Sequence, residues 1–183
     1  MDYGEEDHDA YLASQAVYGS QTHHTSLEKK GYKLDRDLSN YNTRVYSRNG
    51  KAYVVFRGTK LGIVSDLQAD RDILIGTHRR NAQFIKAMRT VQKAKKKYGN
   101  DIIVTGHSLG GTKAIEAANS GNVKAIVFNP GTGLIPLNTG KHKVYVKDKD
   151  IISSRVKGQN IIKSSGGHSL SEFENDFRKR HGY

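Results

Sequence analysis

The chain has 183 residues, and its 30 lysine and arginine residues against 18 acidic residues give a formal net charge of +12. It contains no cysteine, which excludes a disulfide framework, and no apolar run approaching about 18 residues, which excludes a transmembrane helix. The length fits one domain, so residues 1–183 are expected to form a single unit whose positive charge attracts anionic partners.

The first third of the chain predicts one helix and one hairpin. Residues 1–8 are acidic and lack the apolar stretch of a signal peptide, which predicts a flexible acidic tail on a soluble, intracellular protein. Residues 9–18 fit a helix, whereas residues 20–40 are polar and predict irregular structure. Residues 42–57 predict a β-hairpin, because Asn49-Gly50 favours a type I′ turn.

A long basic helix is predicted over residues 78–98 and ends at Gly99. Residues 79–97 hold eight lysine or arginine residues and no acid. The residues near helical spacing, which predict an apolar inner face, are Phe84, Ile85, Met88, Val91 and Gln92. The cationic outer face is either a solvated surface or a contact with an anionic membrane or a nucleic acid. The absence of interleaved aromatic residues disfavours nucleic-acid stacking.

The second half of the chain alternates strands with a helix. Strands are expected at residues 101–105, 123–128 and 142–147, with a short strand at Ile161-Ile162. A helix between the first two strands indicates parallel pairing. The fold class is therefore α/β, with a mostly parallel central sheet flanked by helices.

The most specific motif is the octapeptide at residues 104–111, which reads Val-Thr-Gly-His-Ser-Leu-Gly-Gly. A Gly-x-Ser-x-Gly pattern between an apolar strand and a helix is typical of a nucleophile elbow, in which the serine sits on a strained turn. Gly106 and Gly110 let strand and helix approach closely, and Ser108 is the candidate nucleophile. The alternative is an ordinary Gly-Ser-rich loop. With the elbow, the chain is expected to form a compact, minimal α/β-hydrolase.

A nucleophilic serine needs a base and a carboxylate that orients the base, and in α/β-hydrolases these follow the serine in the order acid, then histidine. Asp148 and Asp150 both follow the strand at residues 142–147. We favour Asp150, because Ile151 and Ile152 should pack and hold it, whereas Asp148 lies between two lysines and resembles an exposed turn residue. Glu116, two turns into the helix after the elbow, is expected to be solvated.

His168 is the candidate base. It follows a flexible Ser-Ser-Gly-Gly segment and precedes a predicted helix with Leu170, Phe173 and Phe177 at helical spacing. His181 also follows the acid, but its place three residues from the end is typical of a frayed tail. His107, inside the elbow, is interpreted as a structural residue that packs behind the serine.

An oxyanion hole requires two donors near the serine. The backbone N–H of Leu109, the residue after the serine, supplies one of them. The second is expected from Thr59, at the end of the apolar strand that reads Ala-Tyr-Val-Val-Phe-Arg-Gly-Thr over residues 52–59. Without the elbow, Gly58-Thr59 would be an ordinary turn.

Together these segments resemble the class 3, fungal lipase-like family of α/β-hydrolases over roughly residues 10–175. The matching segments are residues 53–59, 76–84, 105–111, 128–130, 150–152 and His168. The resemblance implies a carboxylic ester hydrolase acting on acylglycerols or phospholipids, with Ser108, Asp150 and His168 as triad, Thr59 and Leu109 as oxyanion donors, and no metal or cofactor.

Three departures from the family pattern stand out. The region after Thr59, residues 61–75, lacks the tryptophan that usually accompanies a lid, although a short amphipathic lid could still form there. Residues 129–133 read Asn-Pro-Gly-Thr-Gly in place of the usual segment, and Ser153 replaces the proline that usually follows the aspartate motif. The loop that carries the acid is therefore expected to sit differently.

Two alternatives to hydrolysis stay open at this point. The same triad could transfer the acyl group to an alcohol or lipid acceptor. A catalytically silent hydrolase fold could instead serve as a basic membrane-binding or nucleic-acid-binding module. The intact serine, acid and histidine in chain order favour an enzyme with a lipid or small ester substrate. Peripheral contact with an anionic membrane stays open, and the charge leaves nucleic acid as a less favoured partner. The sequence sets no oligomeric state.

Overall fold

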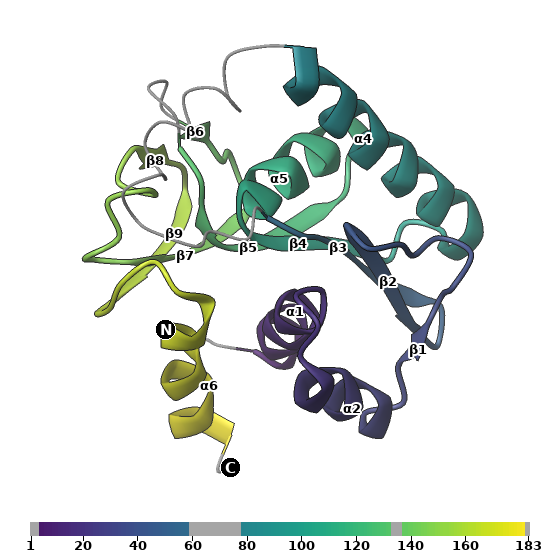
Figure 1. Ribbon diagram of the computed structural model, residues 1–183, viewed down its shortest axis with the longest axis horizontal. Helices are drawn as coiled ribbons and strands as arrows, with labels where there is room; N and C mark the ends of the chain where they lie inside the picture. The colour runs from purple at the N-terminus through teal and green to yellow at the C-terminus, as the bar shows by residue number, and fades with distance from the viewer. Residues whose placement is uncertain (1–3, 59–77, 133–136, 182–183) are drawn as a thin grey trace.

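A computed structural model describes residues 4–58, 78–132 and 137–181, which form an α/β structure around one large sheet (Figure 1). Seven strands are hydrogen-bonded in the order β1-β2-β3-β4-β5-β7-β9. Their bounds are Lys33–Leu34 (β1), Thr43–Arg48 (β2), Lys51–Phe56 (β3), Ile102–Ser108 (β4), Lys124–Pro130 (β5), Lys143–Lys147 (β7) and Asn160–Ser164 (β9). A small second sheet pairs β6 (Leu137–Asn138) with β8 (Val156–Lys157).

Strand direction divides the large sheet into two parts. The pairs β1–β2 and β2–β3 are antiparallel, whereas every pair from β3 to β9 is parallel. The predicted α/β class with a mostly parallel central sheet is confirmed. The carboxyl ends of β3, β4, β5 and β7 therefore meet along one edge, which is where functional residues collect in open α/β sheets.

The predicted hairpin is confirmed as β2 and β3. Asn49 and Gly50 have φ of 51° and 82°, the positive values that a type I′ turn requires at both central positions. Val45 is paired with Val54 across the ladder. This hairpin sets the register of β3, which runs directly into the segment at Gly58.

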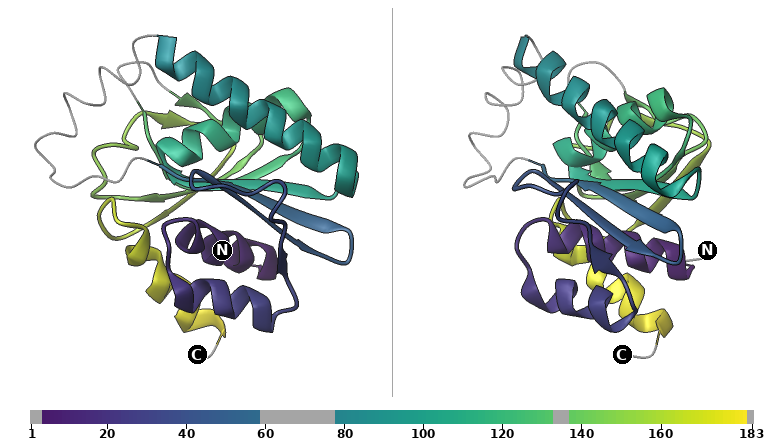
Figure 2. Two further views of the ribbon diagram at one scale, coloured as in Figure 1. Left: turned by 45° about the vertical axis from the view of Figure 1, so that its right-hand side comes forward. Right: turned by 90° about the vertical axis from the view of Figure 1, so that its right-hand side faces the viewer.

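Helices cover both faces of the sheet (Figures 1 and 2). One face carries α1 (Glu5–Ala16), α2 (Gln21–Lys29) and α6 (Glu174–His181), which follows the 3₁₀ turn η1 (Leu170–Phe173). The other face carries α4 (His78–Tyr98) and α5 (Leu109–Gly121). Among the helices of the described segments, none is both long enough and apolar enough to cross a membrane.

The sheet separates two hydrophobic cores. Alternate residues of β3 show this, since Tyr53 and Val55 pack with α1, α2 and α6, and Val54 and Phe56 pack with α4 and α5. The three residues predicted at helical spacing near the C-terminus, Leu170, Phe173 and Phe177, are all buried in the first of these cores. Burial on both faces explains why the central strands read as continuous apolar runs.

The N-terminal segment differs from its predicted structure. Residues 5–8, which we expected to be part of a flexible acidic tail, form the first turns of α1. Asp7 is buried and forms a 2.8 Å ion pair with Lys143, while Glu6 bonds Lys51 and Lys124. These acids are bound by distant lysines, so their charge does not indicate disorder.

Residues 20–40, expected to be irregular, include α2. Only Leu27 of α2 is buried, so the segment lacks the apolar stripe that predicts a helix. The helix is held by tertiary contacts: Leu27 joins the core, and His24 Nδ1 lies 2.9 Å from the Tyr46 hydroxyl. Helices of this length depend on such packing.

The basic helix occupies the predicted residues 78–98, but its inner face is different. The buried positions are Phe84, Ala87, Val91 and Ala94, which follow helical periodicity. Ile85 is 41% exposed and Gln92 is exposed, so the prediction that they face the core is wrong. Small alanines let α4 lie close to the sheet and to α5.

Candidate active site

Ser108 is the last residue of β4 and directly precedes α5. Its backbone has φ of 56° and ψ of −129°, a conformation that L-residues rarely adopt and that stores strain. The side chain of this buried serine therefore projects at the amino end of α5, beyond the carboxyl edge of the sheet. This is the strained strand-to-helix turn that the octapeptide predicts.

The two glycines of the motif are needed because the backbones approach closely. A Cβ atom on Gly106 would lie 2.5 Å from the Gly110 carbonyl, and one on Gly110 would collide with the carbonyl oxygen of Phe56. Gly58 is equally tight, because its Cβ would lie 2.7 Å from the carbonyl oxygen of His107. The end of β3 therefore lies directly against the elbow.

His168 connects the serine to the acid. Its Nε2 lies 3.0 Å from Ser108 Oγ, and its Nδ1 lies 2.9 Å from Asp150 Oδ2. The side chain of His168 is 20% exposed, whereas that of Asp150 is fully buried. The structure thus brings together the three side chains that the sequence selected, from the ends of β4 and β7 and from the loop after β9.

The hydrogen bonds fix the tautomer that this arrangement requires. Asp150, when ionised, only accepts, so His168 Nδ1 carries a proton and Nε2 is free to accept the serine hydroxyl proton. Burial raises the pKa of Asp150, but hydrogen bonds from His168, Ser153 Oγ at 2.6 Å and the Ile152 N–H outweigh it and hold that pKa below its usual value. The acid is therefore kept charged.

The predicted reason for choosing Asp150 is wrong in part. Ile151 is 77% exposed and does not pack over the carboxylate. Polar contacts orient Asp150 instead, and one comes from Ser153, the residue that replaces the family proline. Asp148 is exposed as predicted, and its carboxylate accepts a hydrogen bond from the Gly166 backbone N–H at 3.0 Å. Asp148 thus shapes the approach to the His168 loop.

One of the two predicted oxyanion donors lies within the described residues. Leu109 is the first residue of α5, so its backbone N–H has no carbonyl partner within the helix. Thr59, the predicted second donor, lies outside the described residues, as do residues 61–75 and the side chain of His181. Gly58 follows β3 by two residues and lies against the elbow. Its backbone N–H donates to Tyr18 Oη at 3.1 Å.

His107 has a more direct contact with His168 than the prediction assigned to it. Its Nε2 lies 2.7 Å from the backbone carbonyl of His168, and Tyr18 Oη lies 3.4 Å from its Nδ1. Burial, together with the neighbouring His168, lowers the pKa of His107 to about 4. A neutral His107 therefore fixes the His168 loop from behind the serine, as Tyr18 fixes the end of β3.

Asn129 is a supporting residue that the sequence reasoning missed. It is fully buried at the end of β5 with φ of 39°, and its Nδ2 donates to the carbonyls of Gly167 and His168, both at 3.1 Å. Its Oδ1 accepts the Lys147 N–H at 2.8 Å. The signal was present in the sequence, since an asparagine before a proline ends an apolar strand there.

Within residues 4–58, 78–132 and 137–181, no group of three or more histidine, cysteine, aspartate or glutamate side chains is placed to hold a metal ion. The side chains that the structure brings together at this site are a serine, an imidazole and a carboxylate. Such a set can activate a hydroxyl for attack on a carbonyl carbon.

Two comparisons with known proteins find phospholipases. A family model described as phospholipase-like, Tle-like phospholipase domain, matches residues 5–163. An extracellular phospholipase A1 from Serratia liquefaciens is 23% identical over 185 residues, which cover 90% of this chain and 53% of that protein. The chain thus spans about half the length of the curated relative that it matches.

Proposed function

Because the chain belongs to the phospholipase-like family of Tle-like phospholipase domains, we propose that it is a serine hydrolase that cleaves carboxylic esters of phospholipids through an acyl-enzyme on Ser108. The observation that carries this proposal is the position of His168. Its Nε2 lies 3.0 Å from Ser108 Oγ, and its Nδ1 lies 2.9 Å from Asp150 Oδ2. The comparisons support a phospholipase family and not class 3 lipases specifically, but the resemblance of residues 53–59 and 105–111 to class 3 lipases supports the same roles.

In the first half-reaction, His168 Nε2 removes the proton from Ser108 Oγ as this oxygen attacks the ester carbonyl. Asp150 stabilises the imidazolium and keeps its orientation. The N–H groups of Leu109 and Thr59 stabilise the tetrahedral oxyanion. His168 then donates the proton to the departing alkoxide, which leaves as a lysophospholipid, and the acyl group remains on the serine.

In the second half-reaction, His168 removes a proton from a water molecule that attacks the acyl-enzyme. The new oxyanion uses the same donors, and its collapse returns the proton to Ser108 and releases a fatty acid. No step needs a metal or a cofactor. The name of the Serratia protein specifies A1 activity, and we extend to this chain the preference for the ester at the sn-1 position.

Mixed-acyl phospholipids test the function directly. Phosphatidylglycerol and phosphatidylcholine with different acyl chains at sn-1 and sn-2 are incubated with the purified chain, and products are identified by mass spectrometry. Release of the sn-1 fatty acid by the wild type, but not by Ser108→Ala, supports the proposal. Release of the sn-2 chain would reverse the positional assignment, and no release from phospholipids, triglycerides or p-nitrophenyl esters would support a silent binding module.

An acyltransferase with the same triad is separated by its product. With an added alcohol acceptor, an acyltransferase accumulates the ester of that alcohol in place of free fatty acid. The hydrolase proposal expects free fatty acid as the main product at all acceptor concentrations that leave the protein folded.

A further inference from the structure

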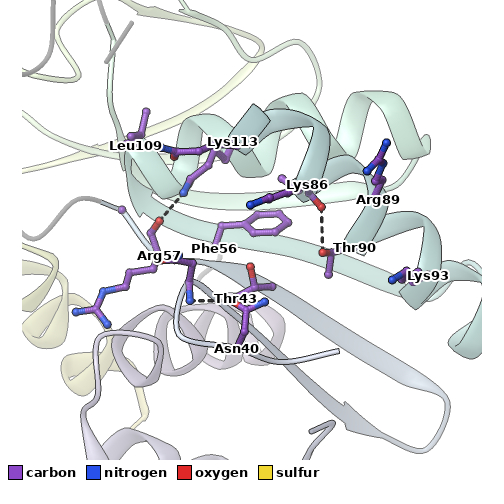
Figure 3. A pocket seen from close by; sticks show the side chains of 14 residues that line it. Asn40, Thr43, Phe56, Arg57, Lys86, Arg89, Thr90, Lys93, Leu109 and Lys113 are labelled. Atoms are coloured by element: carbon purple, nitrogen blue, oxygen red, sulfur yellow. Dashed lines mark hydrogen bonds between the residues drawn. The ribbon is translucent and has the colours of Figure 1, made fainter. Parts of the chain in front are cut away.

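A cavity of about 600 Å³ lies beside the elbow, between α4, the end of the β2–β3 hairpin and the start of α5 (Figure 3). Leu109, the residue after the candidate nucleophile, and Gly58, at the end of β3, both line it. The cavity therefore borders the site at which a substrate ester would react. None of the described residues that line the cavity takes part in the hydrogen bonds among Ser108, His168 and Asp150.

Positive charge dominates this cavity. Five of its lining residues are lysine or arginine, and none of the described lining residues is acidic. Lys86, Arg89 and Lys93 come from one face of α4, which carries these cations at helical spacing (Figure 3). The Arg57 side chain is directed away from the α4 cations, and its guanidinium lies over the ring of Tyr41 at 4.1 Å (Figure 3).

The cations of the cavity have no acidic partner within the segments that the structure describes. Among the described residues, Lys86, Arg89 and Lys93 form no ion pair, whereas Lys97 on the same helix binds Asp35 at 2.8 Å. Like charges gathered in this way repel one another, and the repulsion is relieved when an anion binds.

Lys113 provides a fourth and more unusual cation. It lies on α5 and is only 8% exposed, and its Nζ donates to the Arg57 backbone carbonyl at 2.8 Å (Figure 3). An ammonium group has three N–H donors, so donors remain for a ligand. Burial lowers the pKa of Lys113 to about 8, because desolvation disfavours the charged ammonium group.

We propose that this cavity binds the phosphodiester group of a phospholipid headgroup while the acyl ester of the same molecule lies at Ser108. The inference rests on the proposed function and adds the part of the substrate that is recognised. In a glycerophospholipid, the phosphate and the acyl esters share one glycerol, so a phosphate site must lie close to the nucleophile. Phosphate oxygens accept hydrogen bonds from the ammonium groups of lysine and from side-chain amides, such as those of Asn40 and Asn42 in the cavity lining. Partial enclosure reduces the screening of these charge interactions by salt.

The test removes cavity charge without touching the elbow. The double variant Lys86→Gln with Lys93→Gln neutralises two exposed lining lysines. Its matched control, Lys29→Gln with Lys96→Gln, neutralises two exposed lysines that do not line the cavity, one of them on the same helix. Both doubles have the same net charge, so a difference between them depends on position.

Binding is measured first, without catalysis, in Ser108→Ala protein titrated with glycerophosphoglycerol by calorimetry at about 0.15 M salt. The cavity double should weaken binding by about tenfold or more, since hydrogen bonds to charged groups are lost, and the control should change it less than about twofold. Equal weakening in both doubles would show general charge attraction, and absence of binding would show that there is no headgroup site. Either result overturns the proposal.

A parallel titration with inorganic phosphate distinguishes the two sources of the anion. Tighter binding of inorganic phosphate than of glycerophosphoglycerol would assign the cavity to free phosphate and overturn the headgroup proposal. With catalytically intact protein, the ratio of kcat/KM on phosphatidylglycerol vesicles to that on p-nitrophenyl butyrate should fall in the cavity double relative to the control. Position-specific binding without ester hydrolysis would keep the anion site and reject the hydrolase. Ester hydrolysis without position-specific binding would keep the hydrolase and reject the anion site.

Discussion

His107 Nε2 lies 2.7 Å from the backbone carbonyl oxygen of His168, so the residue before the proposed nucleophile holds the residue proposed as its base. A carbonyl oxygen only accepts, and Nε2 of His107 therefore carries the proton. The elbow thus positions the serine through its own backbone and the imidazole through a side chain. Any change at His107 should affect the alignment of His168 more than the binding of substrate.

Replacing His107 with alanine should lower kcat by about 10- to 100-fold and change KM little, since a displacement of the base of about 1 Å is costly. His107→Gln, which keeps an amide donor, should restore part of the loss. His142→Ala is the control, because His142 is also buried and its Nε2 lies 2.8 Å from Asn119 Oδ1, away from the site. Equal losses in kcat for His107→Ala and His142→Ala would indicate a general effect on stability.

His107 also predicts how stability depends on pH. Its ordinary pKa of 6.5 falls to about 4 in the folded protein, so the unfolded chain binds more protons between these values. The stabilisation is complete above pH 6.5 and is lost as the pH falls toward 4, by about 3 kcal/mol in total. Urea unfolding of wild type and His107→Asn across this range should give curves that converge toward acid. Parallel curves would mean that His107 is not held neutral.

The two aspartates after β7 should respond very differently to the same change. Asp150→Asn should lower kcat by about three to four orders of magnitude, because an amide stabilises the wrong tautomer of His168. Asp148→Asn should lower it no more than about threefold, because Asp148 bonds only the Gly166 N–H of this loop. Initial rates of ester hydrolysis measure both. The reverse order of effects would move the acid role to Asp148.

The elbow can be predicted from the sequence because it depends on a local glycine pattern. The order of serine, acid and histidine can be predicted because α/β-hydrolases share it. Gly106 and Gly110 flank Ser108 at fixed spacing, and the strained turn follows from that pattern. The choice of Asp150 over Asp148 rests on two expectations. Asp148 is exposed as predicted, but Ile151, which is predicted to pack over Asp150, is exposed as well. What holds Asp150 is a set of polar contacts, which no hydrophobic pattern reveals.

The elements that the sequence did not predict depend on distant partners. Asp7 is bound by Lys143, 136 residues away. No local pattern indicates this contact, so the acidic residues by themselves predict a tail. Asn129 contacts Gly167 and His168 across 38 and 39 residues. Leu27 is the single buried residue of α2. A helix with one buried apolar residue shows no repeat of apolar residues at helical spacing.

The most direct test of the serine mechanism is covalent labelling with a fluorophosphonate, followed by digestion and peptide mass spectrometry. One adduct is expected, on Ser108, and it should be absent from Ser108→Ala. In this variant ester turnover should fall by about three orders of magnitude or more. An adduct on another residue, or turnover in Ser108→Ala close to that of the wild type, would contradict the serine mechanism.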